Sequence, residues 1–257
     1  MSHLTLLLQM LTRLPRLQPM PAIRRMRNRN DCVSADMMAE KDNFEAIAHY
    51  LRTQLFPNSD IMSQRTCLNL YRLLAQGEPV SPLVLASTMG EDDGAIRKEL
   101  ADIDPSRLRY DENKNIIAFA GLSQAPAPHR FLCKGHALYT WCVFDALFLP
   151  QLLGAKAMVT TVCPVTDTTI SMCVTPDGPQ QIEPVDTVMS FVMPDQEDLC
   201  GNLRGAFCNY VNFFASRDIG KTWRQNNPNA AILSLDAAFA LGRVRNESYF
   251  KNIIHEL

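Results

Sequence analysis

The feature that most constrains this chain is a long apolar segment that contains a single carboxylate. Residues 137–149 read ALYTWCVFDALFL, and Pro150 follows them. The length predicts a helix closed by the proline, and a helix that is apolar nearly all round is expected to be buried. Asp145 comes three residues after Cys142, so such a helix places both side chains on one face, one turn apart. The fold must therefore enclose this helix and accommodate its carboxylate.

A carboxylate in that position costs free energy unless it has a partner. Burial favours its protonated form, and a neighbouring thiolate would repel its charge, so both effects raise the pKa of Asp145. A carboxyl group that gains and loses a proton near neutral pH is suited to general acid catalysis. A structural alternative is equally open at this point, in which Asp145 is buried only to cap a backbone amide.

The second half of the chain alternates strand-like segments with turns and predicts an antiparallel sheet. The expected strands cover residues 130–133, 158–162, 169–174, 185–193 and 206–214, with helices around Trp223 and over 233–241, and turns at Pro164, residues 176–179 and Pro194. We therefore predict an α+β fold, in which an N-terminal winged-helix-like helical domain precedes an antiparallel-sheet domain whose buried helix carries the active site.

The first half reads as short helices followed by a hairpin. Ser81 and Pro82 predict a helix start, since serine caps free amides and proline fits the first turn. Residues 108–110 and 116–119 flank a polar turn and predict the hairpin. Helices followed by a hairpin are typical of a winged helix-turn-helix. The last helix, within residues 91–103, carries five acidic and two basic side chains and would repel phosphates, so we expect a scaffold and no nucleic-acid partner.

Charge and hydropathy divide the chain further. Residues 1–30 hold six arginines and no acidic residue, and their apolar run precedes the arginines, which is the wrong order for a secretory signal. We predict a basic, disordered extension over 1–36, a winged-helix-like domain over 37–122 and a catalytic domain over 123–257. A mitochondrial transit peptide is the alternative for the extension.

The sequence contains no apolar run long enough to span a bilayer. We therefore expect no membrane partner and a cytoplasmic protein.

Eight cysteines are too few for a disulfide scaffold of this length, and none has the C-x-x-C spacing of a zinc or thioredoxin site. Most are expected to be buried free thiols.

Three separated motifs resemble the alkylmercury lyase (organomercurial lyase) family. They are residues 138–145, which contain Cys142 and Asp145, then Cys163-Pro164 after a strand, and Phe207-Cys208 leading into residues 211–216. The motifs occur in the family's order, and the resemblance runs from about residue 40 to about residue 245. It implies cleavage of a carbon–mercury bond by protonation, which gives a hydrocarbon and Hg(II) in mercury detoxification.

The resemblance also implies roles for individual residues. The family's two reactive cysteines and its aspartate match Cys142, Cys208 and Asp145, with both sulfurs binding mercury, and its structural cysteine matches Cys163. Some members carry a further cysteine where this chain has Asn209, so that accessory thiol is absent here.

The chemistry explains this choice of residues without reference to the family. Mercury is a soft ion, thiolate is the softest ligand of a protein, and a second thiolate weakens the bond from mercury to carbon. A carboxyl group can accept a thiol proton and deliver it to that carbon. No cofactor is required, and external small thiols or a mercuric reductase would remove Hg(II). Trp141, Phe144, Phe207 and Tyr210 are candidate pocket walls.

Two other functions remain open. A metal-responsive transcription regulator would combine a winged helix with a soft-metal sensor, and a metal-storage or chaperone protein would bind mercury or copper without cleaving a bond.

Overall fold

The computed structural model describes residues 29–55 and 59–256, and the contacts divide the chain into two units, Met1–Met37 and Met38–Leu257. Of the first unit only the beginning of helix α1 (Arg29–Tyr50) is described. The extension expected over 1–36 therefore lies outside the described residues as far as residue 28, and residues 29–36 are helical. Within the described ranges, no helix has both the length and the apolar character needed to cross a bilayer.

Helices come first in the described chain, and strands and helices are mixed from residue 108 onward. After α1, the α-helices are α2 (Ile61–Leu74), α3 (Pro82–Met89), α4 (Asp93–Asp102), α5 (Val143–Leu153), α6 (Gln196–Leu199), α7 (Leu203–Ala206), α8 (Arg217–Arg224) and α9 (Leu235–Tyr249). A π-helical turn, η1 (Leu51–Leu55), and three 3-10 turns complete them: η2 (Pro105–Arg107), η3 (Cys208–Tyr210) and η4 (Ile254–Glu256). The strands are β1 (Leu108–Tyr110), β2 (Ile116–Phe119), β3 (Leu122–Ser123), β4 (His129–Cys133), β5 (His136–Thr140), β6 (Ala157–Val162), β7 (Thr169–Thr175), β8 (Gly178–Glu183), β9 (Val188–Phe191), β10 (Phe213–Phe214) and β11 (Ala231–Ser234).

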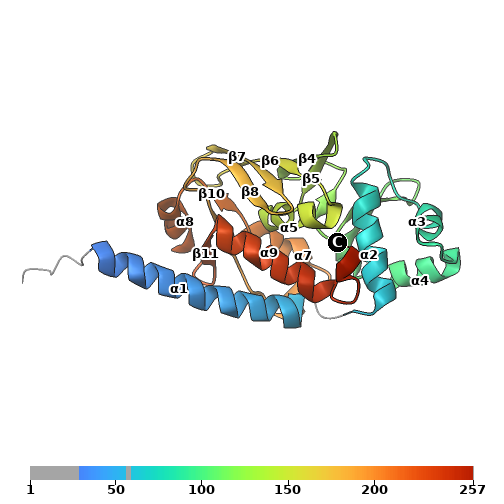
Figure 1. The fold of residues 1–257 in the computed structure, drawn as a ribbon, viewed down its shortest axis with the longest axis horizontal. Helices are drawn as coiled ribbons and strands as arrows, with labels where there is room; N and C mark the ends of the chain where they lie inside the picture. The colour runs from blue at the N-terminus through green and yellow to red at the C-terminus, as the bar shows by residue number, and fades with distance from the viewer. Residues whose placement is uncertain (1–28, 56–58, 257) are drawn as a thin grey trace, which may run out of the picture. The chain divides into compact units, whose positions relative to one another are not determined.

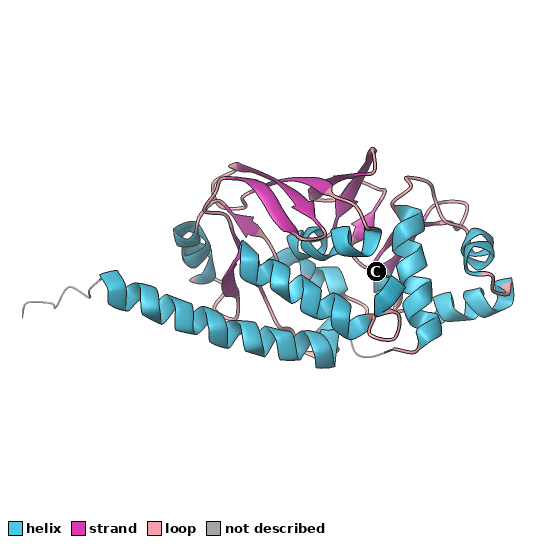
Figure 2. Ribbon diagram, viewed as in Figure 1, coloured by secondary structure: helices cyan, strands magenta, loops and turns pink. Residues whose placement is uncertain are grey.

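Two antiparallel sheets organise the unit that starts at Met38. The larger has the order β1-β2-β3-β5-β4-β6-β7-β8, and the smaller has the order β10-β9-β11. Residues of β6 are alternately buried and exposed, as in a sheet covered on one face. Helix α5 contacts β5, β6 and β7, and α9 contacts α5 and β8, so these two helices cover that face (Figures 1 and 2). The predicted α+β class with antiparallel sheet is confirmed.

Several local predictions also hold. Helix α3 begins at Pro82, and the Ser81 hydroxyl accepts a hydrogen bond from the Val84 amide at 3.2 Å. Strands β1 and β2 form the expected hairpin. The winged-helix likeness of this part stays a prediction, as does the domain boundary after residue 122, which would fall within β3 of the continuous large sheet.

The helix predicted over 137–149 is wrong in its first half. Residues 136–140 form β5, which pairs with β4 across a tight turn at Lys134 and Gly135, both with positive φ. Helix α5 starts only at Val143 and continues to Leu153, with Pro150 inside it. Strand β5 is buried on one face only, through Leu138 and Thr140. The residues of its other face that lie in the predicted helix, Ala137 and Tyr139, are also apolar, so hydropathy could not separate this strand from a buried helix.

Two further segments differ from expectation. The strand predicted over 206–214 is mostly helical turn, with α7 and η3 preceding the two-residue strand β10. The turn predicted over 176–179 is present at residues 176 and 177, but Gly178 and Pro179 already belong to strand β8, the outer strand of the large sheet, which was not expected. Proline is tolerated in an edge strand because one side of that strand forms no ladder hydrogen bonds.

Candidate active site

Cys142 lies at the junction between strand β5 and helix α5. Its backbone is extended, with φ −137° and ψ 171°, and it is the N-cap residue of the 11-residue helix. Unpaired amides and the helix dipole favour negative charge at this end of a helix. A sulfur at the N-cap is therefore in a position where its thiolate form is stabilised as it develops.

Asp145 occupies the third position of α5, one turn from Cys142. Its Oδ2 accepts a hydrogen bond from the Cys142 amide at 2.8 Å. The side chain is only 6% exposed. Burial raises the pKa of Asp145 to about 6, although the Cys142 amide and thiol and the positive charge of Arg245 act in the opposite direction. The structural alternative and the acid–base alternative are thus compatible, since one carboxyl caps an amide and also has a pKa near neutrality.

Cys208 comes to the same place from a distant part of the chain. It begins the 3-10 turn η3, directly after helix α7 and Phe207. The two sulfurs of Cys142 and Cys208 and a carboxylate oxygen of Asp145 all lie within 4.8 Å of one another. Within residues 29–55 and 59–256 this is the one group of three cysteine, histidine or acidic side chains close enough to hold a metal ion. All three side chains are buried.

The electrostatics of this group favour protons on its sulfur in the absence of a substrate. Burial, a hydrogen bond with Cys208 and the negative charges of Asp145 and Cys208 raise the pKa of Cys142 well above its usual value. The thiol therefore needs a base to become a ligand, and the Asp145 carboxylate lies within reach of its proton.

Gly121 is a residue of this site that the sequence analysis missed. It follows β2 in a turn with φ +112°, and a Cβ added there would lie 2.4 Å from the Asp145 carboxyl carbon. The Gly121 carbonyl also accepts a hydrogen bond from the Trp141 amide at 2.9 Å. Only glycine allows the backbone to approach the carboxyl so closely. The signal available in the sequence was a glycine directly after the second strand of a hairpin.

The predicted pocket walls are not all alike. Trp141 and Phe207 are buried beside the two cysteines, and the Arg204 guanidinium lies 5.6 Å from the Trp141 ring centroid. Phe144 and Phe207 both stack edge-on against Phe191, with centroid distances of 5.3 and 5.2 Å. Tyr210 is 42% exposed and contributes to a cleft outside the buried group.

Cys163 is not part of the three-residue group. It follows strand β6 and is fully buried. Burial raises the pKa of its thiol, but hydrogen bonds from the Thr166 hydroxyl and from backbone amides, among them those of Val165 and Ala215, outweigh burial and lower the pKa. Its structural role stays a prediction.

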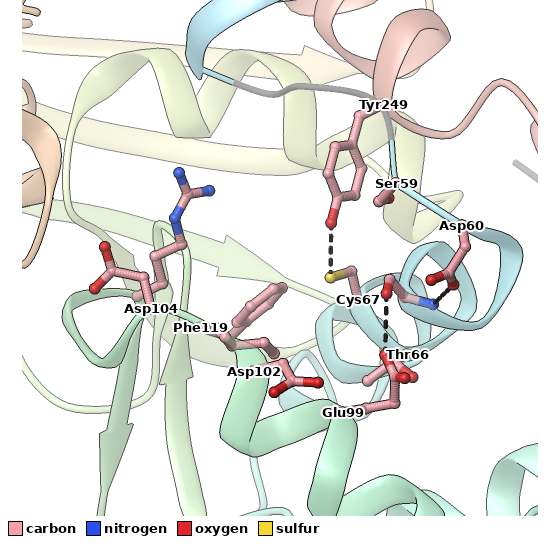
Figure 3. Close-up of a pocket in the computed structure, with 12 residues that line it drawn as sticks. Ser59, Asp60, Thr66, Cys67, Glu99, Asp102, Asp104, Phe119 and Tyr249 are labelled. Carbon is pink, nitrogen blue, oxygen red and sulfur yellow. Dashed lines mark hydrogen bonds between the residues drawn. The ribbon is translucent and has the colours of Figure 1, made fainter. Parts of the chain in front are cut away.

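Another buried cysteine, Cys67, borders an open cavity of about 320 Å³. The Cys67 sulfur lies 3.1 Å from the Tyr249 hydroxyl, and Phe119, Glu99 and Asp60 line the same space (Figure 3). None of the three site residues lines this cavity. This cavity is therefore separate from the group of two sulfurs and a carboxylate.

Comparison with known proteins identifies relatives of this chain. The family model described as alkylmercury lyase matches residues 122–245. An alkylmercury lyase of Streptomyces lividans is 40% identical over 179 residues, which span 70% of this chain and 80% of that protein. The chain belongs to the alkylmercury lyase family.

Other relatives lead to the same family. An alkylmercury lyase of Staphylococcus epidermidis is 34% identical over 68% of this chain and 78% of that protein. The crystal structure of the mercury-bound form of MerB2 superposes with a TM-score of 0.65 at 18% identity and covers 79% of this chain and 98% of that one. This last likeness concerns the fold, and the predicted resemblance to the family is confirmed. The comparisons give no support to a transcription regulator or to a non-catalytic metal carrier.

Proposed function

We propose that Cys142, Cys208 and Asp145 are the catalytic residues with which this member of the family cleaves the carbon–mercury bond of organomercurials. The reaction is a protonolysis, as expected for an alkylmercury lyase, and the assignment of these residues rests on one observation. Two sulfurs and one carboxylate oxygen from two separate segments converge within 4.8 Å in a buried place. Soft sulfur donors together with a proton donor are what this bond cleavage requires.

The steps follow from the positions of the groups. An organomercurial bound to an external thiol exchanges that thiol for one of the two cysteines, and the Asp145 carboxylate takes the proton that a cysteine loses. Coordination by the second sulfur raises electron density on mercury and weakens its bond to carbon. Asp145 then delivers its proton to that carbon, so the electron pair of the carbon–mercury bond becomes the new carbon–hydrogen bond. Hg(II) stays bound to both thiolates.

The surroundings of the site favour this order of events. A pKa of about 6 allows Asp145 to accept a proton from a thiol and to release it again near neutral pH. The buried position excludes water, and in a medium of low dielectric the attraction between a thiolate and a mercury cation is strong. A substrate must displace some of the side chains that bury Cys142 and Cys208 before it can reach both sulfurs.

We further propose that small thiols, or the thiols of a mercuric reductase, remove the bound Hg(II), and that the protein acts in the cytoplasm without a resident cofactor. Thiolate exchange at mercury is associative, so an incoming thiol can replace Cys142 or Cys208 stepwise.

The test compares two sets of cysteine variants in excess thiol with phenylmercury as substrate. Cys142→Ser and Cys208→Ser should each reduce the release of benzene to background, whereas Cys133→Ser, Cys173→Ser and Cys200→Ser should retain most of it. Gas chromatography of the benzene formed measures the activity. Loss of activity in the second set together with its retention in the first would refute the assignment of the site.

A further inference from the structure

Arg245 is a buried cation that the reaction as described does not use. It lies in the middle of α9 with 2% of its surface exposed, although arginine is rarely buried to this extent. Its guanidinium carbon is 4.3 Å from the ring centroid of Phe148, and the rings of Phe250, Tyr249 and Tyr71 follow at 5.3, 5.4 and 5.9 Å. Aromatic faces partly offset the loss of water around a guanidinium. Burial of a permanent charge next to an active site calls for a reason.

A series of contacts connects Arg245 to the Ala120–Gly121 turn, which lies against the Asp145 carboxyl. Its Nη2 donates to the Tyr71 hydroxyl at 3.4 Å, and that hydroxyl donates to the Ala120 carbonyl at 2.9 Å. Ala120 precedes Gly121, whose Cα faces the Asp145 carboxyl so closely that no side chain fits between them. Arg245 and Tyr71 therefore hold the turn on which the Asp145 carboxyl rests.

The charge of Arg245 also reaches the carboxyl. Phe148, against which the guanidinium stacks, lies three residues after Asp145 on α5, so both side chains project from the same side of the helix. Besides burial, the largest effects on the Asp145 carboxyl come from the amide and thiol of Cys142, the charge of Arg245 and the amide of Trp141, and of these four groups Arg245 is the charged one. In a dry interior a fixed charge acts over a longer range than in water.

We infer that Arg245 is a positioning residue of the lyase reaction, which through Tyr71 holds the Ala120–Gly121 turn under Asp145 and whose charge stabilises the carboxylate left when the proton moves to carbon. The inference rests on the proposed function, because it concerns the step in which the Asp145 proton forms the carbon–hydrogen bond and the carbon–mercury bond breaks. A preorganised positive charge favours the step because it is already in place when the negative charge develops on the carboxyl.

The experiment separates uptake of the mercurial from release of the hydrocarbon. In single-turnover reactions with phenylmercury, Arg245→Met should release benzene about tenfold more slowly, while uptake of phenylmercury by the cysteines and the KM stay as in the wild type. Arg245→Lys keeps the charge and should stay within about threefold of the wild-type rate. Tyr71→Phe keeps the ring and removes the hydroxyl, and should slow release by about threefold without changing uptake.

Arg72→Met is the matched control. Arg72 lies on α2, as Tyr71 does, and its guanidinium donates to the carbonyls of Leu152 and Glu256, away from Asp145. This variant should release benzene at the wild-type rate. If Arg245→Met does not fold, Tyr71→Phe decides the outcome.

The inference is overturned if a folded Arg245→Met protein releases benzene at the wild-type rate, or if uptake falls in step with release, which would indicate a packing role only. If Arg245→Met does not fold, a wild-type release rate in Tyr71→Phe overturns it. Failure of the proposed function looks different, since the wild type would then release no benzene or Cys142→Ser would still release it.

Discussion

Two buried cysteines in this molecule have opposite surroundings. Cys67 borders the open cavity of about 320 Å³ and has the Tyr249 hydroxyl 3.1 Å from its sulfur. Cys142 does not line this cavity, but at the N-cap of helix α5 it has a second sulfur and a carboxylate oxygen within 4.8 Å. Neither burial nor an adjacent cavity is therefore enough to make a thiol reactive. The reactivity depends on which donor groups lie next to the sulfur.

The electrostatics sharpen this difference. Burial raises the pKa of both thiols, and at Cys67 the hydrogen bond with Tyr249 and the charge of Arg245 oppose that effect. The pKa of Tyr249 is itself raised by burial, so its hydroxyl is no base near neutral pH. The carboxylates of Glu99 and Asp60 line the cavity at Cys67, but they accept hydrogen bonds from Ser63. The Asp145 carboxyl accepts its hydrogen bond from Cys142 itself, so soft-metal chemistry is expected at Cys142 and not at Cys67.

The largest effect is expected from removing the proton donor. Asp145→Asn keeps the size of the side chain and an oxygen that can accept from the Cys142 amide, but it has no carboxyl proton to deliver. Hydrocarbon release should fall by about 10²- to 10⁴-fold, the usual contribution of a general acid, whereas both cysteines should still bind mercury. Gas chromatography measures the hydrocarbon, and mass spectrometry under native conditions measures bound mercury.

Asp60→Asn is the control for that prediction, since Asp60 caps α2 beside the cavity at Cys67. Its hydrocarbon release should match that of the wild type. An Asp145→Asn protein with undiminished release would remove the distinction between the two cysteines.

A smaller effect concerns stability and pH. The pKa of Asp145 is about 6 in the folded protein against an ordinary value of 3.8, so between these values the folded state holds a proton that the unfolded state has lost. The free energy of unfolding contributed by this group is then highest below pH 4, falls as the pH rises to about 6, and is level above that. The full difference is at most about 3 kcal/mol.

Asp145→Asn lacks this titration, so its stability relative to the wild type should increase between pH 4 and pH 7. Urea unfolding at the two pH values measures the change. A constant difference between the two proteins would mean that the carboxyl is not held in a dry environment.

The smallest effect on hydrocarbon release is expected from a substitution of Cys67. Cys67→Ser should leave the rate of hydrocarbon release unchanged, because Cys67 is not part of the described group of two sulfurs and a carboxylate. It places a hydroxyl where a buried sulfur was and should lower the free energy of unfolding by about 1 kcal/mol, measured by urea unfolding. A Cys67→Ser protein that loses turnover while remaining folded would show that the cavity takes part in the reaction.

Local rules predicted the elements whose signals are short-range. Ser81 caps α3 through its hydroxyl as expected, and the hairpin of β1 and β2 follows from its polar turn. Segments that are apolar on both faces gave weaker local signals. Residues 137–140 look helical by hydropathy, but their pairing with β4 makes them a strand, and such long-range pairing leaves no local signal. The same holds around Cys208, where only Phe213 and Phe214 pair with β9.

The residues of the site also divide into those that the sequence could predict and those that it could not. Cys142 and Asp145 could be paired from their spacing, although the reason differs from the one expected, since Cys142 caps the helix on which Asp145 lies. Cys208 was assigned through the family resemblance, because nothing local relates it to Cys142. Gly121 and Arg245 were missed, since each acts on Asp145 from another element of the fold.

The residue types alone show which chemistry is available, because they fix which atoms are soft donors and which carry a proton. The spacing of Cys142 and Asp145 also pairs them, because neighbours three positions apart meet whether the first is inside a helix or at its cap. The packing of the whole chain is needed to bring the Cys208 sulfur and the Gly121 backbone to that pair and to place the Arg245 charge where it acts on Asp145. Contacts between such distant segments depend on how complete elements pack against each other, which no short stretch of sequence specifies.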